Sequence, residues 1–399
     1  MAAILKPSSR LQSIDALRGA IMIIMALDHT RDFFHAAAML SSPTDLTRTY
    51  PLLFFTRWIT HFCAPVFTFT AGLGAFFWLQ RGRTKGQLSR FLLTRGIWLI
   101  FLDLTVMQFG YNFSFSTRYP VLLLVLWELG ACMVVLAALV HLPYRLLAFL
   151  SIAVIVFHNL FDRINAASLG HYAPLWNVLH QPGAFPIFGI LVIIGYPLVP
   201  WVAVMSAGFC FGRIFLLEPV IRQKIIVMTG SALTLLFLLL RGANLYGDPS
   251  RWSTQPSPLF TLLSFLNCTK YPPSLLYLLM TLGPALIFLA FLDRCHFKEG
   301  NPLLIFGRVP LFYFVTHFYL IHLLSSLASL LRYGARSYPI LFSPVPSMGG
   351  PEDLFPANFG YPLWVVYAVW ILVVVSLYPV CRRFANLKAT RSDWWLSYL

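Results

Sequence analysis

The chain has 399 residues, of which 58% are hydrophobic and only 11% are charged. A soluble domain carries about 25% charged residues, and a chain this apolar could not cover its own surface with polar groups, so the composition excludes a soluble globular protein. The net charge of +15 is spread over many short loops rather than gathered in one basic domain, which excludes a nucleic-acid-binding protein.

Apolar runs long enough to cross a bilayer recur along the whole chain. A transmembrane helix needs about 20 consecutive apolar residues. Because lipid offers no partner for free backbone N–H and C=O groups, each run must be helical. The chain is therefore predicted to be an all-α, polytopic transmembrane helix bundle of about ten (10–11) helices. The ten spans lie near 15–36, 52–79, 91–110, 121–140, 146–161, 186–212, 225–240, 272–292, 302–331 and 362–381.

Two apolar segments need separate interpretation. The first span is not a cleavable signal peptide, because it has no small-residue cleavage site and Asp28 and Arg31 interrupt its second half. Residues 258–267 are apolar but too short to span, so they are predicted to form a re-entrant or interfacial piece. Since no stretch resembles a soluble domain, residues 1–399 are expected to form a single transmembrane domain.

The distribution of Lys and Arg predicts the orientation. Cytoplasmic loops of membrane proteins carry an excess of these residues. The loop 81–95 and the tail from Arg382 onward are the most basic, and Lys6 and Arg10 precede the first span. These segments fall on the same side if there are ten spans. Both termini are therefore predicted to be cytoplasmic.

The first span holds ionisable residues, which are costly at membrane depth and usually functional. Asp15 and Arg18 share a helix face near its start, and Asp28, Asp32 and His35 share a face near its end. His29 lies three residues before Asp32. A carboxylate beside an imidazole would orient a general base, but a structural ion pair among Asp28, Arg31 and Asp32 fits the spacing equally well.

Other spans add polar residues at similar depth. Each of them taken alone is best explained as a hydrogen-bonded packing residue, whereas together they indicate a polar cavity that opens outward. They are Arg57, His61, Asp103, Glu128, His158, Asp162, Tyr313, Thr316, His317 and His322. No metal is expected, because His29 and His35 are six residues apart and do not share one helix face.

The opening motif resembles a known family. Arg10-Leu-Gln-Ser-Ile-Asp15-Ala-Leu-Arg18-Gly19, followed by an apolar run to His29, looks like the start of the transmembrane acyltransferase superfamily. Two of its branches fit: the heparan-α-glucosaminide N-acetyltransferase catalytic-domain family, which has many bacterial members, and the acyltransferase-three family of O-antigen and peptidoglycan acetylases. Further segments resemble the first branch, and residues 10–230 are the most family-like part. They are 62–72, Leu129-Gly130, 270–277, 307–317 and the tail 394–399.

The resemblance implies an integral membrane acyltransferase of the bacterial cytoplasmic (inner) membrane. An acetyl or acyl group would pass from cytoplasmic acetyl-CoA, or another acyl-CoA, to a hydroxyl or amine of an extracytoplasmic sugar or cell-envelope glycan. A homodimer in contact with membrane lipids is also implied. The acyl group would move either directly or through a covalent acyl-histidine.

The same resemblance, combined with the chemistry of the residues, assigns roles in the site. His29 is the first choice for the general base and His35 the second. Asp28 or Asp32 would orient the ring, and His317 would approach from the ninth span. The cofactor-binding residues are predicted to be Asp15, Arg18 and, in the basic loop, Arg95, because guanidinium groups suit CoA phosphates.

Two other classes of protein fit part of the sequence. A transporter for a polar solute or a lipid-linked sugar would also place charges at membrane depth, although no internal repeat of the kind that many transporters show is visible. A membrane scaffold would need no cluster of histidines. Replacement of His29 and His317 without any effect on activity would favour the scaffold.

Overall fold

The computed structural model describes residues 11–39, 41–116, 119–338, 355–356, 358–391 and 393–398. Lys6, Arg10 and Leu399 lie outside these residues. Within them the chain is mainly helical, and eight helices are long and apolar enough to cross a membrane. Of the other predicted spans, α1 (Gln12–Phe34) contains five charged residues and α6 (Val125–Leu139) has 15 residues. The prediction of an all-α polytopic membrane protein is confirmed, while the cytoplasmic location of both termini stays a prediction.

The remaining elements follow in chain order. The helices are α2 (Pro51–Thr60), α3 (Cys63–Leu79), α4 (Lys85–Leu102), α5 (Gln108–Asn112), α7 (Tyr144–Phe157), α8 (Ala173–Leu179), α9 (Leu198–Phe211), α10 (Pro219–Ala243), α11 (Pro258–Leu266), α12 (Leu275–Leu292), α13 (Pro302–Arg308), α14 (Pro310–Tyr333) and α16 (Leu363–Thr390). The strands are β1 (Val121–Leu123), β2 (Gly183–Ile187) and β3 (Ile190–Ile194).

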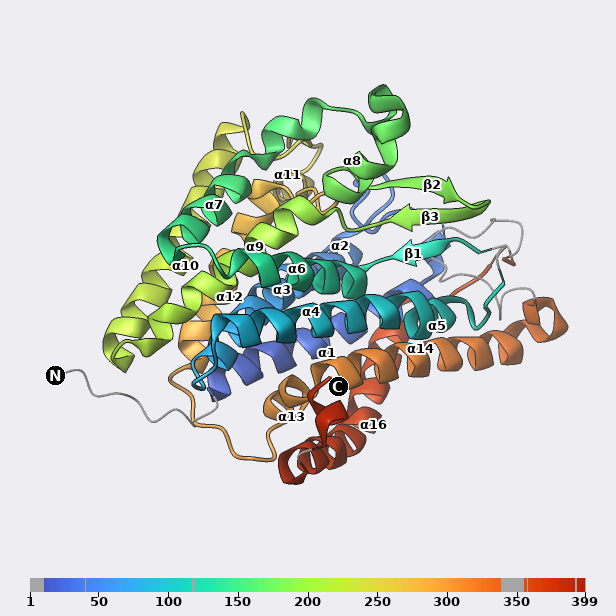
Figure 1. Cartoon of the computed structure of the whole chain (residues 1–399). Coiled ribbons are helices and arrows are strands. Elements are labelled where there is room, and N and C mark those ends of the chain that lie inside the picture. Colours follow the sequence, from blue (N-terminus) through green and yellow to red (C-terminus); the bar gives the residue numbers. More distant parts are fainter. Residues whose placement is uncertain are drawn as a thin grey trace.

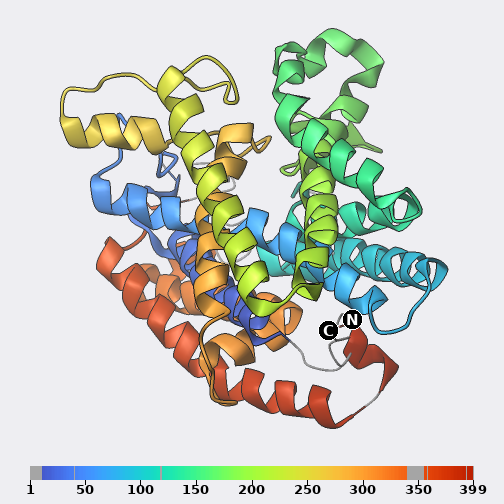
Figure 2. The same cartoon turned by 90° about the vertical axis from the view of Figure 1, so that its left-hand side faces the viewer.

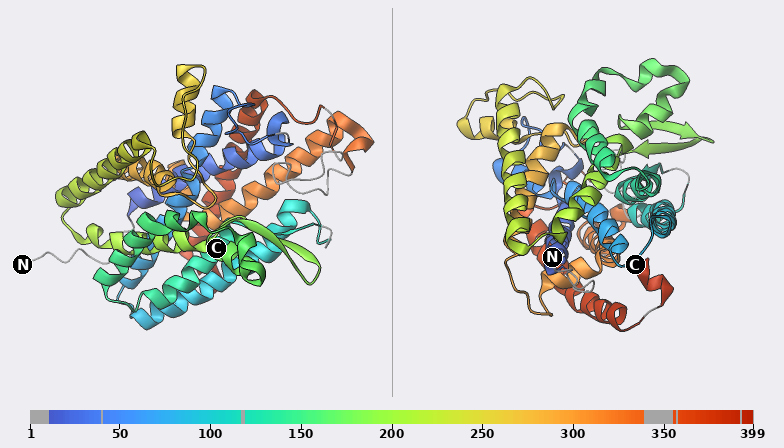
Figure 3. Two further views of the ribbon diagram at one scale, coloured as in Figure 1. Left: turned by 90° about the horizontal axis from the view of Figure 1, so that it is seen from above. Right: turned by 60° about the vertical axis from the view of Figure 1, so that its left-hand side comes forward.

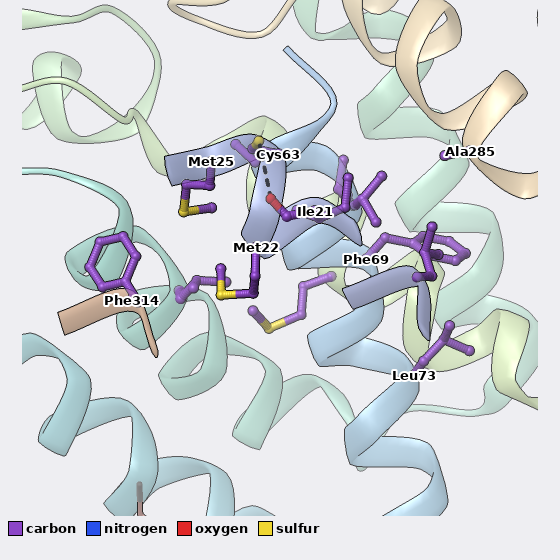
Figure 4. Packing of buried hydrophobic residues seen from close by; sticks show 14 of the residues in the cluster. Ile21, Met22, Met25, Cys63, Phe69, Leu73, Ala285 and Phe314 are labelled. Atoms are coloured by element: carbon purple, nitrogen blue, oxygen red, sulfur yellow. Dashed lines mark hydrogen bonds between the residues drawn. The ribbon is translucent and has the colours of Figure 1, made fainter. Parts of the chain in front are cut away.

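Helix α1 runs through the middle of the bundle and contacts α3, α12, α13, α14 and α16 (Figure 1). Most of its side chains are buried, so a helix with several charges is enclosed by apolar neighbours. Figure 4 shows part of this packing, including the hydrogen bond from Cys63 Sγ to the carbonyl of Ile21. On another side, Trp370 Nε1 of α16 donates to the carbonyl of Ile23 at 2.8 Å.

The outer helices form two opposite sides of the bundle. Figure 2 shows α14 and α16 (orange and red) on the side away from α7 and α8 (green). Seen from above, the β2–β3 hairpin and the last turns of α14 project at the end opposite to the N-terminus (Figure 3).

Glycines permit the closest helix contacts. A Cβ on Gly19 would overlap the carbonyl of Leu303, and a Cβ on Gly307 would overlap that of Asp15, so α1 and α13 touch backbone to backbone. Gly72 of α3 and Gly208 of α9 meet the backbone of the facing helix in the same way. Small residues that let helices approach closely are typical of membrane bundles.

Two predicted spans are interrupted rather than continuous. The span 52–79 breaks at His61 and Phe62 into α2 and α3. The span 302–331 breaks at Val309, whose φ of −131° and ψ of 49° end α13. The residue before a proline is disfavoured in the helical region, so Pro310 explains this break. Contacts of α13 with α1 run antiparallel, whereas those of α14 with α1 run parallel, so the chain reverses direction at Val309.

The predicted helical span 186–212 is wrong at its start. Residues 183–194 form a β-hairpin, and β3 also pairs in parallel with β1, giving the strand order β1-β3-β2. Phe188 and Gly189, both with positive φ, make the tight turn, and the β-branched Ile and Val residues of β3 favour a strand. The spanning helix begins only at Leu198.

The loop between α10 and α12 is held by buried polar residues. The guanidinium of Arg241 donates to four backbone carbonyls, those of Ser250, Ser264, Phe265 and Asn267. The carboxylate of Asp248 accepts from both Thr269 and Ser274. Helix α11, in this loop, has nine residues and is too short to span, as predicted. The loop therefore presents Lys270 and Tyr271 in a fixed position above α12.

Candidate functional site

Two histidines from distant parts of the chain form a pair. Nδ1 of His29 on α1 lies 2.8 Å from Nε2 of His317 on α14. Their ring planes are nearly parallel, at 2°, with centroids 5.0 Å apart. His317 is fully buried, whereas His29 keeps some exposure. His29 is therefore the more exposed ring of the pair.

The hydrogen bonds of His317 assign the tautomers of both rings. Its Nδ1 lies 2.7 Å from the carbonyl oxygen of Tyr313, and because a carbonyl can only accept, Nδ1 carries the hydrogen. In the neutral ring Nε2 is then an acceptor, so His29 donates to it through Nδ1. This assignment leaves Nε2 of His29 with a lone pair, which is the form a general base requires.

The carboxylates of α1 form an ion-pair network. Asp28 Oδ1 lies 2.9 Å from Arg31 Nη1 and accepts from Thr60 at 2.8 Å, while Asp28 Oδ2 accepts from Arg57 at 2.5 Å. Arg31 also pairs with Asp32. The ion pair that the sequence left open as an alternative is therefore formed. The ring of His29 is oriented by His317, and a catalytic role for Asp28 and Asp32 stays a prediction.

His35 lies at the end of α1, away from the histidine pair. Its side chain is buried, and Nε2 is 3.3 Å from the hydroxyl of Tyr50. The backbone N–H of His35 closes the last turn of the helix on Arg31, and the residue makes a β-bridge with Tyr361. These contacts place His35 in the packing of the α1 end, and the structure does not bring it to His317.

A cavity of about 220 Å³ lies between α1, α3, α4, α6 and α14. Two of the predicted cofactor-binding residues, Arg18 and Arg95, line it, while Asp15 is buried at the contact with α13. Its other lining residues are mostly apolar and include Trp78, Phe91, Met25 and Phe314.

The cavity leads toward the histidine pair. Met25 precedes His29 by one helical turn, and the ring of Phe314 is 6.0 Å from the ring of His29. Arg18 lies further toward the start of α1 and donates to the carbonyl of Thr70. The cavity is thus lined by two guanidinium groups, and its lining residues Met25 and Phe314 lie close to His29, which is not itself a lining residue.

Several other predicted polar residues serve the scaffold. Asp103 accepts from the backbone N–H groups of Leu124 and Trp127 and so caps α6 from a neighbouring segment. His158 Nε2 lies 2.8 Å from the carbonyl of Pro273, and His180 pairs with Asp162. Glu128 accepts from Thr68 and Cys132, and His322 Nδ1 contacts the carbonyl of Gly110.

Residues that the sequence reasoning did not select also lie at the site. Lys270 Nζ is 5.0 Å from the centre of the Tyr271 ring and 5.9 Å from that of Tyr196, in the same region as Arg57 and His61. Trp78 and Phe91 stack on one another in the cavity wall. Aromatic residues near basic loops are ordinary at membrane interfaces, so their sequence signal did not single them out.

The described part of the chain contains no set of side chains that could bind a metal ion. Within residues 11–398, apart from the gaps given above, no three His, Cys, Asp or Glu side chains converge as a metal site requires. The described site therefore consists of an imidazole pair, an ion-pair network and a cavity with arginines.

The comparison with protein families identifies the family to which the chain belongs. The family described as heparan-alpha-glucosaminide N-acetyltransferase, catalytic, matches residues 10–241, which is more than half of the chain and runs from the start of α1 to the end of α10. No curated protein matches the chain. The match includes Arg18, His29 and the α3–α4 wall of the cavity. The chain belongs to the heparan-α-glucosaminide N-acetyltransferase catalytic-domain family.

Proposed function

We propose that the protein transfers an acetyl or acyl group from acyl-CoA in the cavity to a hydroxyl or amine of an extracytoplasmic sugar or cell-envelope glycan. The observation that carries this proposal is the His29–His317 pair close to a mostly apolar cavity that Arg18 and Arg95 line, with Phe314 of the cavity wall 6.0 Å from the His29 ring. The family adds that its members are acetyltransferases of the membrane.

The cavity suits the donor in shape and chemistry. The pantetheine arm of CoA is long and weakly polar, which matches walls made of Leu, Phe, Met and Ala side chains. Charged phosphates cannot enter hydrocarbon at low cost, so they would stay with Arg18 and Arg95. The thioester would then lie at the Met25 and Phe314 end, beside His29.

His29 acts as the base in this mechanism. Nε2 takes the proton from the hydroxyl or amine of the acceptor, whose lone pair attacks the thioester carbonyl. The C–S bond breaks, and the proton passes from His29 to the CoA thiolate. During the transfer, His317 accepts from Nδ1–H of His29 and holds the ring. An acyl group carried briefly on His29 would use the same arrangement.

The orientation predicted from the basic loops decides from which side of the membrane each substrate would come. With both termini in the cytoplasm of a bacterium, the α3–α4 turn faces the cytoplasmic donor. The acceptor would then approach from the side of Lys270 and Tyr271. A homodimer surrounded by membrane lipids completes the proposal.

The test is turnover of radiolabelled acetyl-CoA by the purified protein, compared with the His29→Ala variant. General base catalysis contributes typically ~10²–10⁴-fold, so the variant should lose that much activity while binding acetyl-CoA with unchanged affinity. His141→Ala is the matched control, because His141 is exposed on the turn between α6 and α7. Label retained on the denatured protein would identify the acyl-histidine route.

Two outcomes would contradict the proposal. Wild-type turnover in a folded His29→Ala protein would show that the base lies elsewhere. Failure of the folded wild-type protein to bind acetyl-CoA would exclude it as the donor, and longer acyl-CoAs would then be tested in the same way.

The second candidate, a transporter, is favoured by the interrupted helices. The breaks at His61 and at Val309 lie on helices that contact α1, and many transporters bind their substrates at such breaks. The test is uptake of a labelled sugar into liposomes that contain the protein. A transporter should take up the sugar unchanged when no acyl-CoA is present. The acyltransferase requires instead that the sugar emerge acylated.

A further inference from the structure

Two stacked aromatic rings at the α3–α4 turn are flanked on either side by a guanidinium group. Cζ of Arg83 lies 5.2 Å from the centre of the Trp78 ring. Trp78 stacks on Phe91 with centroids 4.7 Å apart and an angle of 12° between the planes. Cζ of Arg95 lies 5.9 Å from the centre of the Phe91 ring. These four residues are called the arginine–aromatic stack below.

The turn that holds the stack is locally well defined. Thr84 caps α4 by accepting from the backbone of Gln87, and Gln87 accepts in return from the backbone of Thr84, which is a complete capping box. Gly82 takes the positive φ of 76° that the turn needs. The two rings therefore approach one another from helices whose ends are fixed.

The stack forms one end of the cavity. Trp78, Phe91 and Arg95 line it together with Arg18, and Arg83 covers the outer face of Trp78. A single Trp beside an Arg would be an ordinary interfacial pair. Here both rings and two arginines border the same hollow, so this end suits a ligand with an aromatic or anionic head.

The separation of Arg18 and His29 along α1 agrees with a long arm behind that head. Arg18 and His29 are eleven residues apart on α1, which is a rise of roughly 16 Å in an α-helix. This is comparable to an extended phosphopantetheine arm. A head bound at the stack would thus leave a thioester near His29.

We propose that the arginine–aromatic stack is the subsite for the nucleotide end of the donor, so that the protein accepts nucleotide-bearing acyl thioesters and discriminates against acyl-phosphopantetheine carried on a protein. This proposal rests on the proposed function. Guanidinium groups bind phosphate oxygens through paired N–H bonds. Trp78 and Phe91 are each flanked by the other ring and by a guanidinium group, so they hold the two guanidinium groups in place, and the outer planes of these groups offer a stacking surface for a purine.

The first experiment measures binding of adenosine 3′,5′-bisphosphate, which has neither an arm nor a thioester. Calorimetry is done with the full chain in phosphatidylcholine nanodiscs. Loss of one stacking partner typically costs 1–3 kcal/mol, so Trp78→Leu should weaken binding about tenfold. Arg83→Gln should have a similar effect. The controls are Phe288→Leu, in a stacked Phe288–Phe291 pair on α12, and Arg294→Gln, an exposed arginine after α12.

The second experiment separates this proposal from the proposed function. Trp78→Leu should raise the KM for acetyl-CoA about tenfold but leave the kinetics with S-acetyl-4′-phosphopantetheine unchanged. Equal effects on both thioesters, or none on either, would overturn the subsite. If neither thioester reacts in wild-type protein yet the bisphosphate binds, the acyltransferase proposal fails and the nucleotide subsite stands.

The phosphate group that binds at the arginine–aromatic stack could also belong to a lipid headgroup. The binding measurements are therefore repeated in nanodiscs that contain phosphatidylglycerol. Unchanged affinity for the bisphosphate supports a nucleotide subsite. Competition by the anionic lipid that disappears in Arg83→Gln would show that the stack serves lipid headgroups and would overturn the proposal.

Discussion

The histidine pair differs from the usual arrangement in which a carboxylate orients a catalytic imidazole. Here the group that accepts from Nδ1–H of His29 is another imidazole, which is itself fixed by the carbonyl of Tyr313. A neutral acceptor stabilises an imidazolium less than a carboxylate would. The neighbouring carboxylates of Asp28 and Asp32 do not change this, because Arg31 and Arg57 balance their charge.

Substitution of His317 tests this assignment at the level of one hydrogen bond. Glutamine can place its amide oxygen where Nε2 accepts, whereas leucine keeps the volume without an acceptor. His317→Gln should therefore keep a large part of kcat, and His317→Leu should lose about tenfold to a hundredfold of it, as expected for loss of a group that orients a catalytic residue. Steady-state kinetics with acetyl-CoA gives kcat and KM separately.

The KM for acetyl-CoA should stay the same in both variants, since His317 is buried behind His29. Thermal unfolding in detergent serves as the control for folding. Equal activity of the Gln and Leu variants, both folded, would show that the hydrogen bond from His29 has no role in catalysis.

At this scale helical spacing was informative within α1 but not across helices, where only the family resemblance indicated that His317 would approach from the ninth span. Helical spacing correctly placed Asp28, Arg31 and Asp32 together, because residues three and four apart share a face. It could not pair His29 with a residue 288 positions away. Nor could spacing decide that Asp28 would bond to Arg57 of α2, since that depends on how two helices pack.

At the scale of elements, the contact between α1 and α13 determines where His29 and His317 meet. Gly19 and Gly307 bring the two backbones together, and the reversal at Val309 then sends α14 alongside the second half of α1. His29 and His317 face each other as a result. The dipeptide Val309-Pro310 indicates this break in the sequence. The break was not predicted because the mainly apolar residues 302–331 were interpreted as one continuous span.

Gly307→Ala tests that close contact. The added methyl would overlap the carbonyl of Asp15, and overpacking of this kind typically costs 1–3 kcal/mol. The variant should show a lower Tm in detergent and reduced activity. Gly242→Ala is the matched control, because nothing lies within 4 Å of a Cβ there. A Gly-to-Ala change in an open helical site should leave the Tm unchanged or slightly higher.

An equal Tm for the Gly307→Ala and wild-type proteins would show that α13 can move away from α1 at no cost.

The β2–β3 hairpin is the other element that apolar content alone could not identify. A run of Ile, Val and Leu satisfies the criterion for a span in either conformation, and only the turn at Phe188-Gly189 distinguishes the strand pair.

On the scale of the whole molecule, the two substrates would reach His29 from opposite ends of the bundle. The arginine–aromatic stack and Arg18 lie where α1 begins, and Lys270 and Tyr271 lie in the loop beyond the start of α12. The helical nature of the spans could be predicted, since it follows from the cost of exposing backbone polar groups to lipid, and in the described part of the chain eight of the ten predicted spans are helices long and apolar enough to cross a membrane. The single-domain organisation over residues 1–399 stays a prediction.

The orientation of the molecule can be measured by labelling from one side. Cys295 is the partly exposed cysteine among the six, all of which are free, so Cys295→Ser gives a background of buried thiols. Arg81→Cys is then placed in the α3–α4 turn, and Thr47→Cys in the exposed segment before α2. In intact bacterial cells, a membrane-impermeant maleimide should label Thr47→Cys and spare Arg81→Cys, and inside-out vesicles should reverse the result. Labelling of Arg81→Cys in intact cells would put the arginine end of the cavity outside, where cytoplasmic acyl-CoA cannot reach it, and the donor would then have to be an extracytoplasmic one.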